Sequence, residues 1–182
     1  MEIFKYVNGF DYNTVILSND GKKAFCQDCN GLVILDITDT HNTVEIGKYE
    51  IEGLAMHMAV SEDEDKAYIT VHNVGLVIVD ISNTLNIVEI GSCEIEGNIF
   101  DVALSKDGTK AYVVNNTHPK SSRKSHLITI DISDPSNPIK ICEKHLDRKN
   151  GNSIKLSKDG KRAFISCGEY LEVVDIKTDE EV

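Results

Sequence analysis

The chain has 182 residues, 41% of them hydrophobic and 27% charged, so it can bury a substantial core and is not expected to be disordered. Its formal net charge of −11 argues against general binding to nucleic acid or to anionic membranes, and no apolar run approaches the ~18 residues of a membrane span. The first residues, MEIFKYVNGFDYN, lack the features of a secretory signal, and the five cysteines follow no disulfide framework. We therefore expect a cytoplasmic protein with free thiols.

The first predicted elements form a unit of four short strands. The segment VILSNDGKKAF (15–25) reads as a strand, a Ser-x-Asp-Gly turn and the start of a second strand, with Gly21 supplying a positive φ. The unbroken apolar run LVILDITD (32–39) predicts a third strand that is covered on both faces. The alternating segment VEIGKYEIEG (44–53) predicts an outermost fourth strand.

The same unit recurs three more times along the chain. Its first block recurs as MAVSEDEDKAY, VALSKDGTKAY and IKLSKDGKRAF, and its third-strand block recurs as LVIVDISN, LITIDISD and LEVVDIKT. Four antiparallel strands in every ~40–45 residues are the signature of a β-propeller blade. The sequence thus predicts one all-β domain over residues 1–182, with four four-stranded blades at about 10–53, 54–97, 98–146 and 147–182 plus 1–9.

The N-terminal segment MEIFKYV resembles the fourth-strand block VEIGKYE, which the fourth unit lacks. We expect residues 1–9 to complete the last blade, because closing the ring removes an open sheet edge. Closure within one chain predicts a compact four-bladed monomer. The alternative is a strand-swapped homodimer, in which two chains form an eight-bladed ring with twofold symmetry.

Through these repeats the sequence resembles the LVIVD-repeat family of β-propellers, most closely at GLVIVDIS (75–82). The resemblance covers essentially the whole chain and implies the propeller fold, but it implies little about activity. Residues that recur in every unit are expected to be scaffold. These include the aspartates that end each third strand, whose carboxylates should accept N–H bonds from the following turn; they are Asp36, Asp80, Asp131 and Asp175.

The departures from the repeat are the candidates for function. Residues 116–149 contain seven Lys or Arg against four acids, in a chain that is otherwise strongly acidic. This stretch is either a solvated loop or a docking site for an anionic ligand or an acidic segment of a protein partner. The candidate contacts are His118, Lys120, Arg123, Lys124, Arg148 and Lys149.

Two other groups suggest chemistry. Four polar residues, Thr14, His57, Asp101 and Ser153, occupy one position at the start of the innermost strands, where His57 and Asp101 could orient a water or simply fill a hydrogen-bonded ring. A metal site could draw on Cys29, His72 and Cys167, with His118 nearby, although neighbouring turns need not reach ligand distance.

We expect a non-enzymatic interaction or scaffold module without a cofactor, which binds a protein partner of unknown identity through one face. The first alternative is an acidic inhibitor or immunity-type protein that caps a basic partner. The second is a metal-dependent hydrolase or lactonase with His57 and Asp101 at the channel mouth.

Overall fold

The structure, a computed structural model, describes residues 12–117 and 124–176, and every regular element in these ranges is a β-strand. The strands are β1 (Thr14–Leu17), β2 (Lys23–Asp28), β3 (Gly31–Asp36), β4 (Val44–Glu50), β5 (Ala55–Val60), β6 (Lys66–Val71), β7 (Gly75–Asp80), β8 (Val88–Glu94), β9 (Asn98–Leu104), β10 (Lys110–Thr117), β11 (Lys124–Asp131), β12 (Ile139–His145), β13 (Gly151–Leu156), β14 (Arg162–Cys167) and β15 (Tyr170–Asp175). The all-β prediction is confirmed. The described residues include no helix with the length and apolar character needed to cross a membrane.

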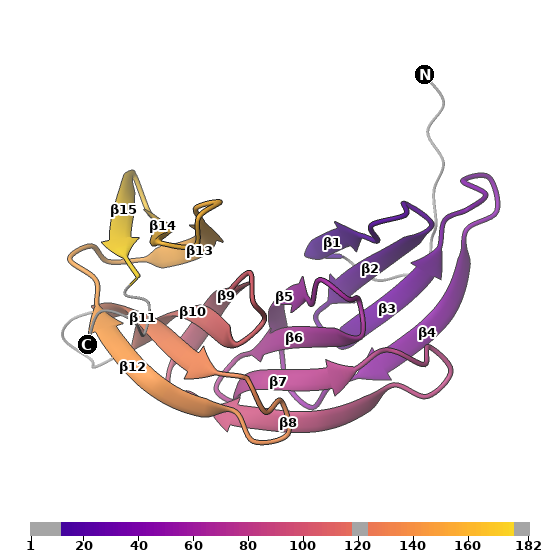
Figure 1. Cartoon of the computed structure of the whole chain (residues 1–182), viewed down its shortest axis with the longest axis horizontal. Coiled ribbons are helices and arrows are strands. Elements are labelled where there is room, and N and C mark those ends of the chain that lie inside the picture. The colour runs from indigo at the N-terminus through magenta and orange to yellow at the C-terminus, as the bar shows by residue number, and fades with distance from the viewer. Residues whose placement is uncertain (1–11, 118–123, 177–182) are drawn as a thin grey trace.

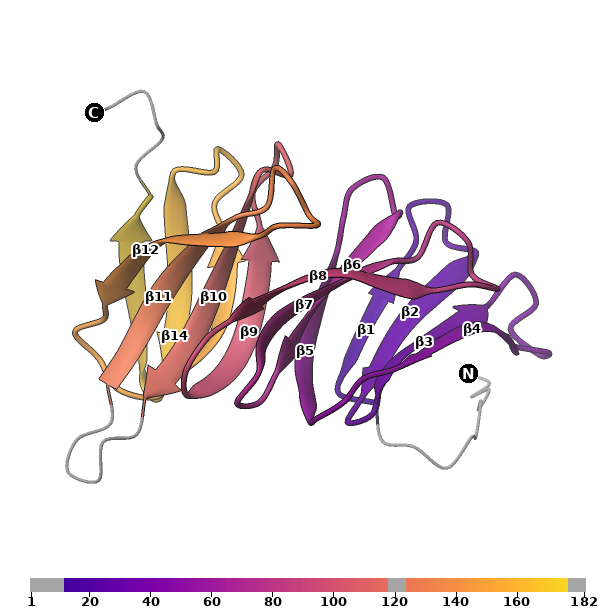
Figure 2. The same cartoon turned by 90° about the horizontal axis from the view of Figure 1, so that it is seen from below.

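The strands form four antiparallel sheets, each built from consecutive strands. Blade one contains β1–β4, blade two β5–β8, blade three β9–β12, and blade four the three strands β13–β15. Figure 1 shows the blades fanned into an arc, with the first strand of each blade on the concave side. In Figure 2, blades one, two and three follow one another in chain order, and blade four overlaps blade three in that view. The predicted propeller architecture is confirmed.

The turn that joins the first two strands of each blade is held by its serine and aspartate. Ser105 Oγ donates to Asp107 Oδ1 at 2.6 Å, and the Lys110 N–H donates to Ser105 Oγ at 2.9 Å. The corresponding serine–aspartate bonds of the other three repeats measure 2.8, 2.5 and 2.5 Å. These contacts explain why the serine and the aspartate recur together, because each satisfies backbone or side-chain donors inside the turn.

The aspartates that end the third strands also have the predicted structural role. Asp36, Asp80 and Asp131 each accept an N–H bond from the residue two places on, at 2.8, 2.9 and 2.9 Å. The backbone N–H bond is the main reason that the pKa of Asp36 and the pKa of Asp131 lie below the ordinary value. The residue two places after Asp175 lies outside the described part of the chain.

The core lies between the blades. In blades one to three, the aromatic residue of the second strand and the first residue of the LVIVD block pack against the next blade, and in blades one and two the third residue of the block does so as well. On the facing side, the next blade contributes the alternate residues of its own second and third strands to the same hydrophobic cluster. Between blades two and three this places Tyr68, Leu76 and Ile78 against Val113 and Ile130, all nearly inaccessible to solvent. Equivalent clusters join blades one and two, and blades three and four.

Two glycines in the outer strands allow the blades to approach each other. A Cβ on Gly47 would lie 2.7 Å from the backbone oxygen of Thr84, and one on Gly91 would lie 2.2 Å from that of Pro135. Both oxygens belong to the turn between the third and fourth strands of the following blade. The glycine of each VEIG block is therefore explained by close packing of the next blade, not by an unusual φ.

The expectation of a closed ring needs correction. The four sheets are not closed, and blades one and four form the two ends of the arc (Figure 1). The proposed closing strand, residues 1–9, lies outside the described residues. The repeat pattern fixes how each blade packs on its neighbour, whereas closure depends on the rotation between blades, which the pattern does not encode.

Candidate functional site

The structure brings three of the four polar residues at the start of the innermost strands together. His57 Nδ1 lies 2.8 Å from Asp101 Oδ1, and Ser153 Oγ donates to Asp101 Oδ2 at 2.7 Å. The Ile154 N–H donates to the same Oδ2 at 2.9 Å. Asp101 is wholly buried and thereby links blades two, three and four. Thr14, on β1, does not join this cluster through any hydrogen bond of the described residues, and its buried Oγ1 has no partner among them.

The environment of Asp101 favours its ionised form. Burial acts to raise its pKa, but the contact with His57 and the bonds from Ser153 and Ile154 outweigh that effect, so the pKa lies below the ordinary value. The Val102 N–H also donates to Oδ1 at 2.8 Å. Because both carboxylate oxygens are occupied by structural partners, Asp101 is poorly placed to activate a water.

The same geometry does not create an activated serine. A Ser–His–Asp arrangement needs the serine hydroxyl hydrogen-bonded to the histidine. Here the hydroxyl of Ser153 donates to Asp101 instead. The cluster of His57, Asp101 and Ser153 therefore serves as a buried polar link between the inner strands, which we term the clasp, and the His57 side chain is about one-third exposed at its edge.

The predicted basic contacts are only partly described. His118, Lys120 and Arg123 lie outside the described residues. Lys124 begins β11 and is exposed. Arg148 and Lys149 lie in the connection between β12 and β13 and are also exposed. This connection, the links between the other blades, and the turns between second and third strands lie at one end of the blades, which we term the top face.

Arg148 and Lys149 line a hollow on the top face with a volume of about 450 Å³. The Arg148 guanidinium lies over the Tyr170 ring, with Cζ 4.3 Å from the ring centroid. The carboxylate of Glu172 accepts the backbone N–H groups of Asp147 and Arg148 at 2.9 and 3.1 Å. These bonds hold the connection against β15. The sequence did not indicate the contribution of Tyr170 or Glu172, because neither stands in the basic stretch.

The proposed metal ligands are not brought together. Cys29 follows β2 in blade one and is exposed, His72 follows β6, and Cys167 is buried at the end of β14 in blade four. Blades one and four are the two ends of the arc (Figure 1). Within residues 12–117 and 124–176, no group of three or more His, Cys, Asp or Glu side chains is arranged to hold a metal ion.

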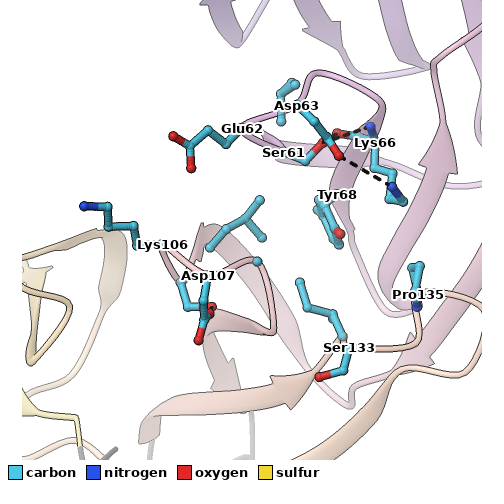
Figure 3. A pocket seen from close by; sticks show the side chains of 14 residues that line it. Ser61, Glu62, Asp63, Lys66, Tyr68, Lys106, Asp107, Ser133 and Pro135 are labelled. Atoms are coloured by element: carbon cyan, nitrogen blue, oxygen red, sulfur yellow. Dashed lines mark hydrogen bonds and ion pairs between the residues drawn. The ribbon is translucent and has the colours of Figure 1, made fainter.

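A larger hollow, of about 760 Å³, lies at the opposite end of the blades, which we term the bottom face (Figure 3). It lies between the Ser–Asp turns of blades two and three. Figure 3 shows Tyr68 and Lys66 on one side and Asp107, Ser133 and Pro135 on the other. A further top-face hollow of about 630 Å³ lies between the same two blades and includes Lys140.

The acidic segment SEDEDK (61–66) lies beside the bottom-face hollow and has Glu64 where the other three repeats have the turn glycine. Glu64 Oε1 accepts the Asn19 N–H at 2.5 Å, and Glu64 Oε2 lies 3.4 Å from Lys23 Nζ. Asn19 Nδ2 also donates to the Glu62 backbone oxygen at 3.1 Å. The departure from the repeat therefore ties blade two to blade one.

The comparisons with known proteins agree with the propeller fold. The model of the family described as LVIVD repeat matches residues 20–51, 52–95 and 122–142, together more than half of the chain. No curated protein matches the chain.

Solved structures match the fold at low identity. A proposed 6-phosphogluconolactonase from Bacteroides uniformis is 15% identical, with a TM-score of 0.74 over 91% of this chain and 50% of that one. The β-propeller domain of Cps50 (Swd1) from Myceliophteria thermophila is 9% identical, with a TM-score of 0.74 over 92% of this chain and 54% of that one. A protein from Lactobacillus plantarum is 13% identical, with a TM-score of 0.77 over 95% of this chain and 53% of that one. The chain thus spans about half the length of these structures, and the likeness shows the fold alone.

Proposed function

The chain belongs to the LVIVD-repeat family, and from this premise we propose that it is a non-enzymatic binding module that takes a protein partner on its top face. Blades of near-identical pattern supply the scaffold, so selectivity must come from what differs between them. On the described part of the top face, the clearest difference is the β12–β13 connection with Arg148 and Lys149.

The observation that carries the proposal is the stacking of Arg148 on Tyr170 beside a hollow. Tyr170 is 54% exposed although its ring is already ordered by the guanidinium. Arg and Tyr are enriched among the residues that contribute most to binding at protein interfaces. Ordered side chains also lose less conformational entropy when a partner binds. Glu172 holds the backbone that carries Arg148, which extends this preorganisation.

The charge of the surroundings suggests the chemistry of the partner. With a net charge of −11, most of the chain repels acidic segments. Arg148 and Lys149 extend beside the hollow where a carboxylate could pair with a guanidinium through two parallel hydrogen bonds. A partner segment that combines an acidic group with an apolar side chain fits this surface.

The test compares two charge-matched double variants of the chain. Arg148→Ala with Lys149→Ala removes two cations from the top face, whereas Lys158→Ala with Lys161→Ala removes two exposed cations from the bottom face of the same blade. Affinity capture with quantitative mass spectrometry should recover a partner with the parent and the bottom-face variant, and at least about tenfold less with the top-face variant. Equal recovery by both variants would refute the proposal.

The hydrolase alternative has one observation in its favour, the 2.8 Å approach of His57 to Asp101. The name of the Bacteroides uniformis structure points in the same direction, but at 15% identity that likeness extends to the fold alone. Thermal melting of the parent and of His57→Ala with Ca²⁺ or Zn²⁺ separates the readings. A cation that stabilises the parent and not the variant would favour the hydrolase. Absence of any shift would favour the clasp. The inhibitor alternative predicts instead a basic partner that still binds after the top-face substitutions.

A further inference from the structure

Repeat-equivalent residues are buried between blades but exposed at the two ends of the arc. Leu171 in β15 is 64% exposed, whereas its equivalents Leu32, Leu76 and Leu127 are at most 4% exposed. Val173 is 48% exposed, whereas Ile34 and Ile78 are inaccessible. The residue equivalent to Leu171 packs against the following blade in blades one to three, and the residue equivalent to Val173 does so in blades one and two. Blade four thus presents a face that is built for a following blade.

Blade one presents the complementary face along its inner strand. Val15 is 59% exposed, whereas its equivalents Met58, Val102 and Ile154 are at most 3% exposed because each packs against the preceding blade. Leu17, on the same side of β1, is 61% exposed. Farther out on this face, Cys26 and Val33 are already buried in a small cluster of the same chain. The missing contact is therefore centred on β1.

The curvature of the arc indicates how the two faces are covered. The four blades superpose on 54% of the Myceliophteria thermophila propeller domain, with a TM-score of 0.74. Four blades with this spacing span about half of a ring, so blade four of one chain does not reach blade one of the same chain (Figure 1). Two arcs joined head to tail complete the ring and repeat the inter-blade contact twice.

We propose that Leu171 and Val173 of blade four dock against Val15 and Leu17 of a second copy of this chain, which closes two arcs into one ring. At each of the two interfaces, the exposed face of blade four packs against the exposed face of blade one. This is the same kind of contact that consecutive blades make inside one chain. The proposal is independent of the partner on the top face.

The test is the solution mass by light scattering, at concentrations up to about 100 μM, where contacts of micromolar Kd are formed. The parent chain should have about twice its own mass of 20.2 kDa. Leu171→Glu and Val15→Glu should each weaken association at least about tenfold, because each buries an unpaired charge. The matched control is Leu85→Glu, at a residue that is 91% exposed and outside both faces, and it should leave the mass unchanged.

Mixing the two variants gives a second, sharper readout. A head-to-tail pair of Leu171→Glu with Val15→Glu has both charges at one interface and none at the other, so mixing should restore two-chain particles. The circular dichroism spectra should match that of the parent, since both residues are exposed within a single chain. A parent of single-chain mass, particles larger than two chains, or a mixture that stays monomeric would each overturn the proposal.

Discussion

Replacing Asp101 with alanine should destabilise the chain strongly. The substitution removes the acceptor for the Ser153 hydroxyl, for the Ile154 N–H and for the Val102 N–H, and the contact with His57. A buried donor that loses its partner costs about 1–3 kcal/mol, and a solvent-accessible one costs less. Ile154 and the Nδ1 atom of His57 are buried, whereas Ser153 is partly exposed. We therefore expect a loss of about 3–5 kcal/mol in the free energy of unfolding, out of about 5–15 kcal/mol in total.

Urea unfolding followed by far-ultraviolet circular dichroism measures this loss, because the chain contains no tryptophan. With a slope of about 2 kcal/mol per molar urea, the midpoint should fall by about 2 M. Asp131→Ala, which removes a turn aspartate from the same blade, should shift the midpoint much less. Asp101→Asn should fall between the two, because its amide oxygen can still accept one N–H bond. Equal midpoints for Asp101→Ala and Asp131→Ala would show that Asp101 does not link the blades.

Acid should weaken the same clasp in a defined direction. The pKa of Asp101 is lowered in the folded chain, so its contribution is complete above the unfolded value near 3.8 and is lost as the pH falls below it. Between about pH 5 and about pH 3, the parent should therefore lose more free energy of unfolding than Asp101→Asn does. Parallel pH profiles for the two proteins would contradict this assignment.

Two further predictions concern the packing of blade two. Gly91→Ala should lower the free energy of unfolding by about 1–3 kcal/mol, because its Cβ would lie 2.2 Å from the Pro135 oxygen. Gly108→Ala has a φ of +69° but open space around the Cβ, so it should cost about 1 kcal/mol. Thermal melting that ranks Gly108→Ala as the less stable of the two would contradict the steric argument. Glu64→Ala should lower the free energy of unfolding by about 1 kcal/mol, because it removes the contacts with Asn19 and Lys23. Glu64→Gly removes the same contacts, but its stability should stay near that of the parent because glycine adopts the φ of 61° at this position without strain. Urea midpoints check this pair, and a glycine variant as unstable as the alanine variant would show that backbone strain at Glu64 is negligible.

The blade itself could be predicted from the sequence because its signals are local. The Ser–Asp turn at Ser105 and the N–H bond to Asp36 follow from side chains within a few residues of the groups that they bind. Alternation and apolar runs then decide which residues are buried. The repeat register places His57 and Asp101 on neighbouring inner strands, where their side chains lie 2.8 Å apart.

The closure of the ring and the composition of the top-face site could not be predicted in this way. Four near-identical repeats are compatible with four or eight blades per ring, because side-chain volumes at each interface set the rotation between blades. The stacking of Arg148 on Tyr170 joins the β12–β13 connection to the start of β15, 22 positions along the chain, and the two segments share no sequence pattern. The contacts of Glu64 with Asn19 and Lys23 join two blades and likewise follow from no local pattern.

The buried thiols lie in different parts of the arc, so their reactivity can report the order in which the blades unfold. Cys93 lies in the cluster between blades two and three, Cys167 in the cluster between blades three and four, and Cys26 on the far side of blade one. Burial raises the pKa of all three thiols, so each is unreactive until its own region opens. Timed alkylation followed by peptide mass analysis would therefore show whether the arc unzips from one end or melts as a unit.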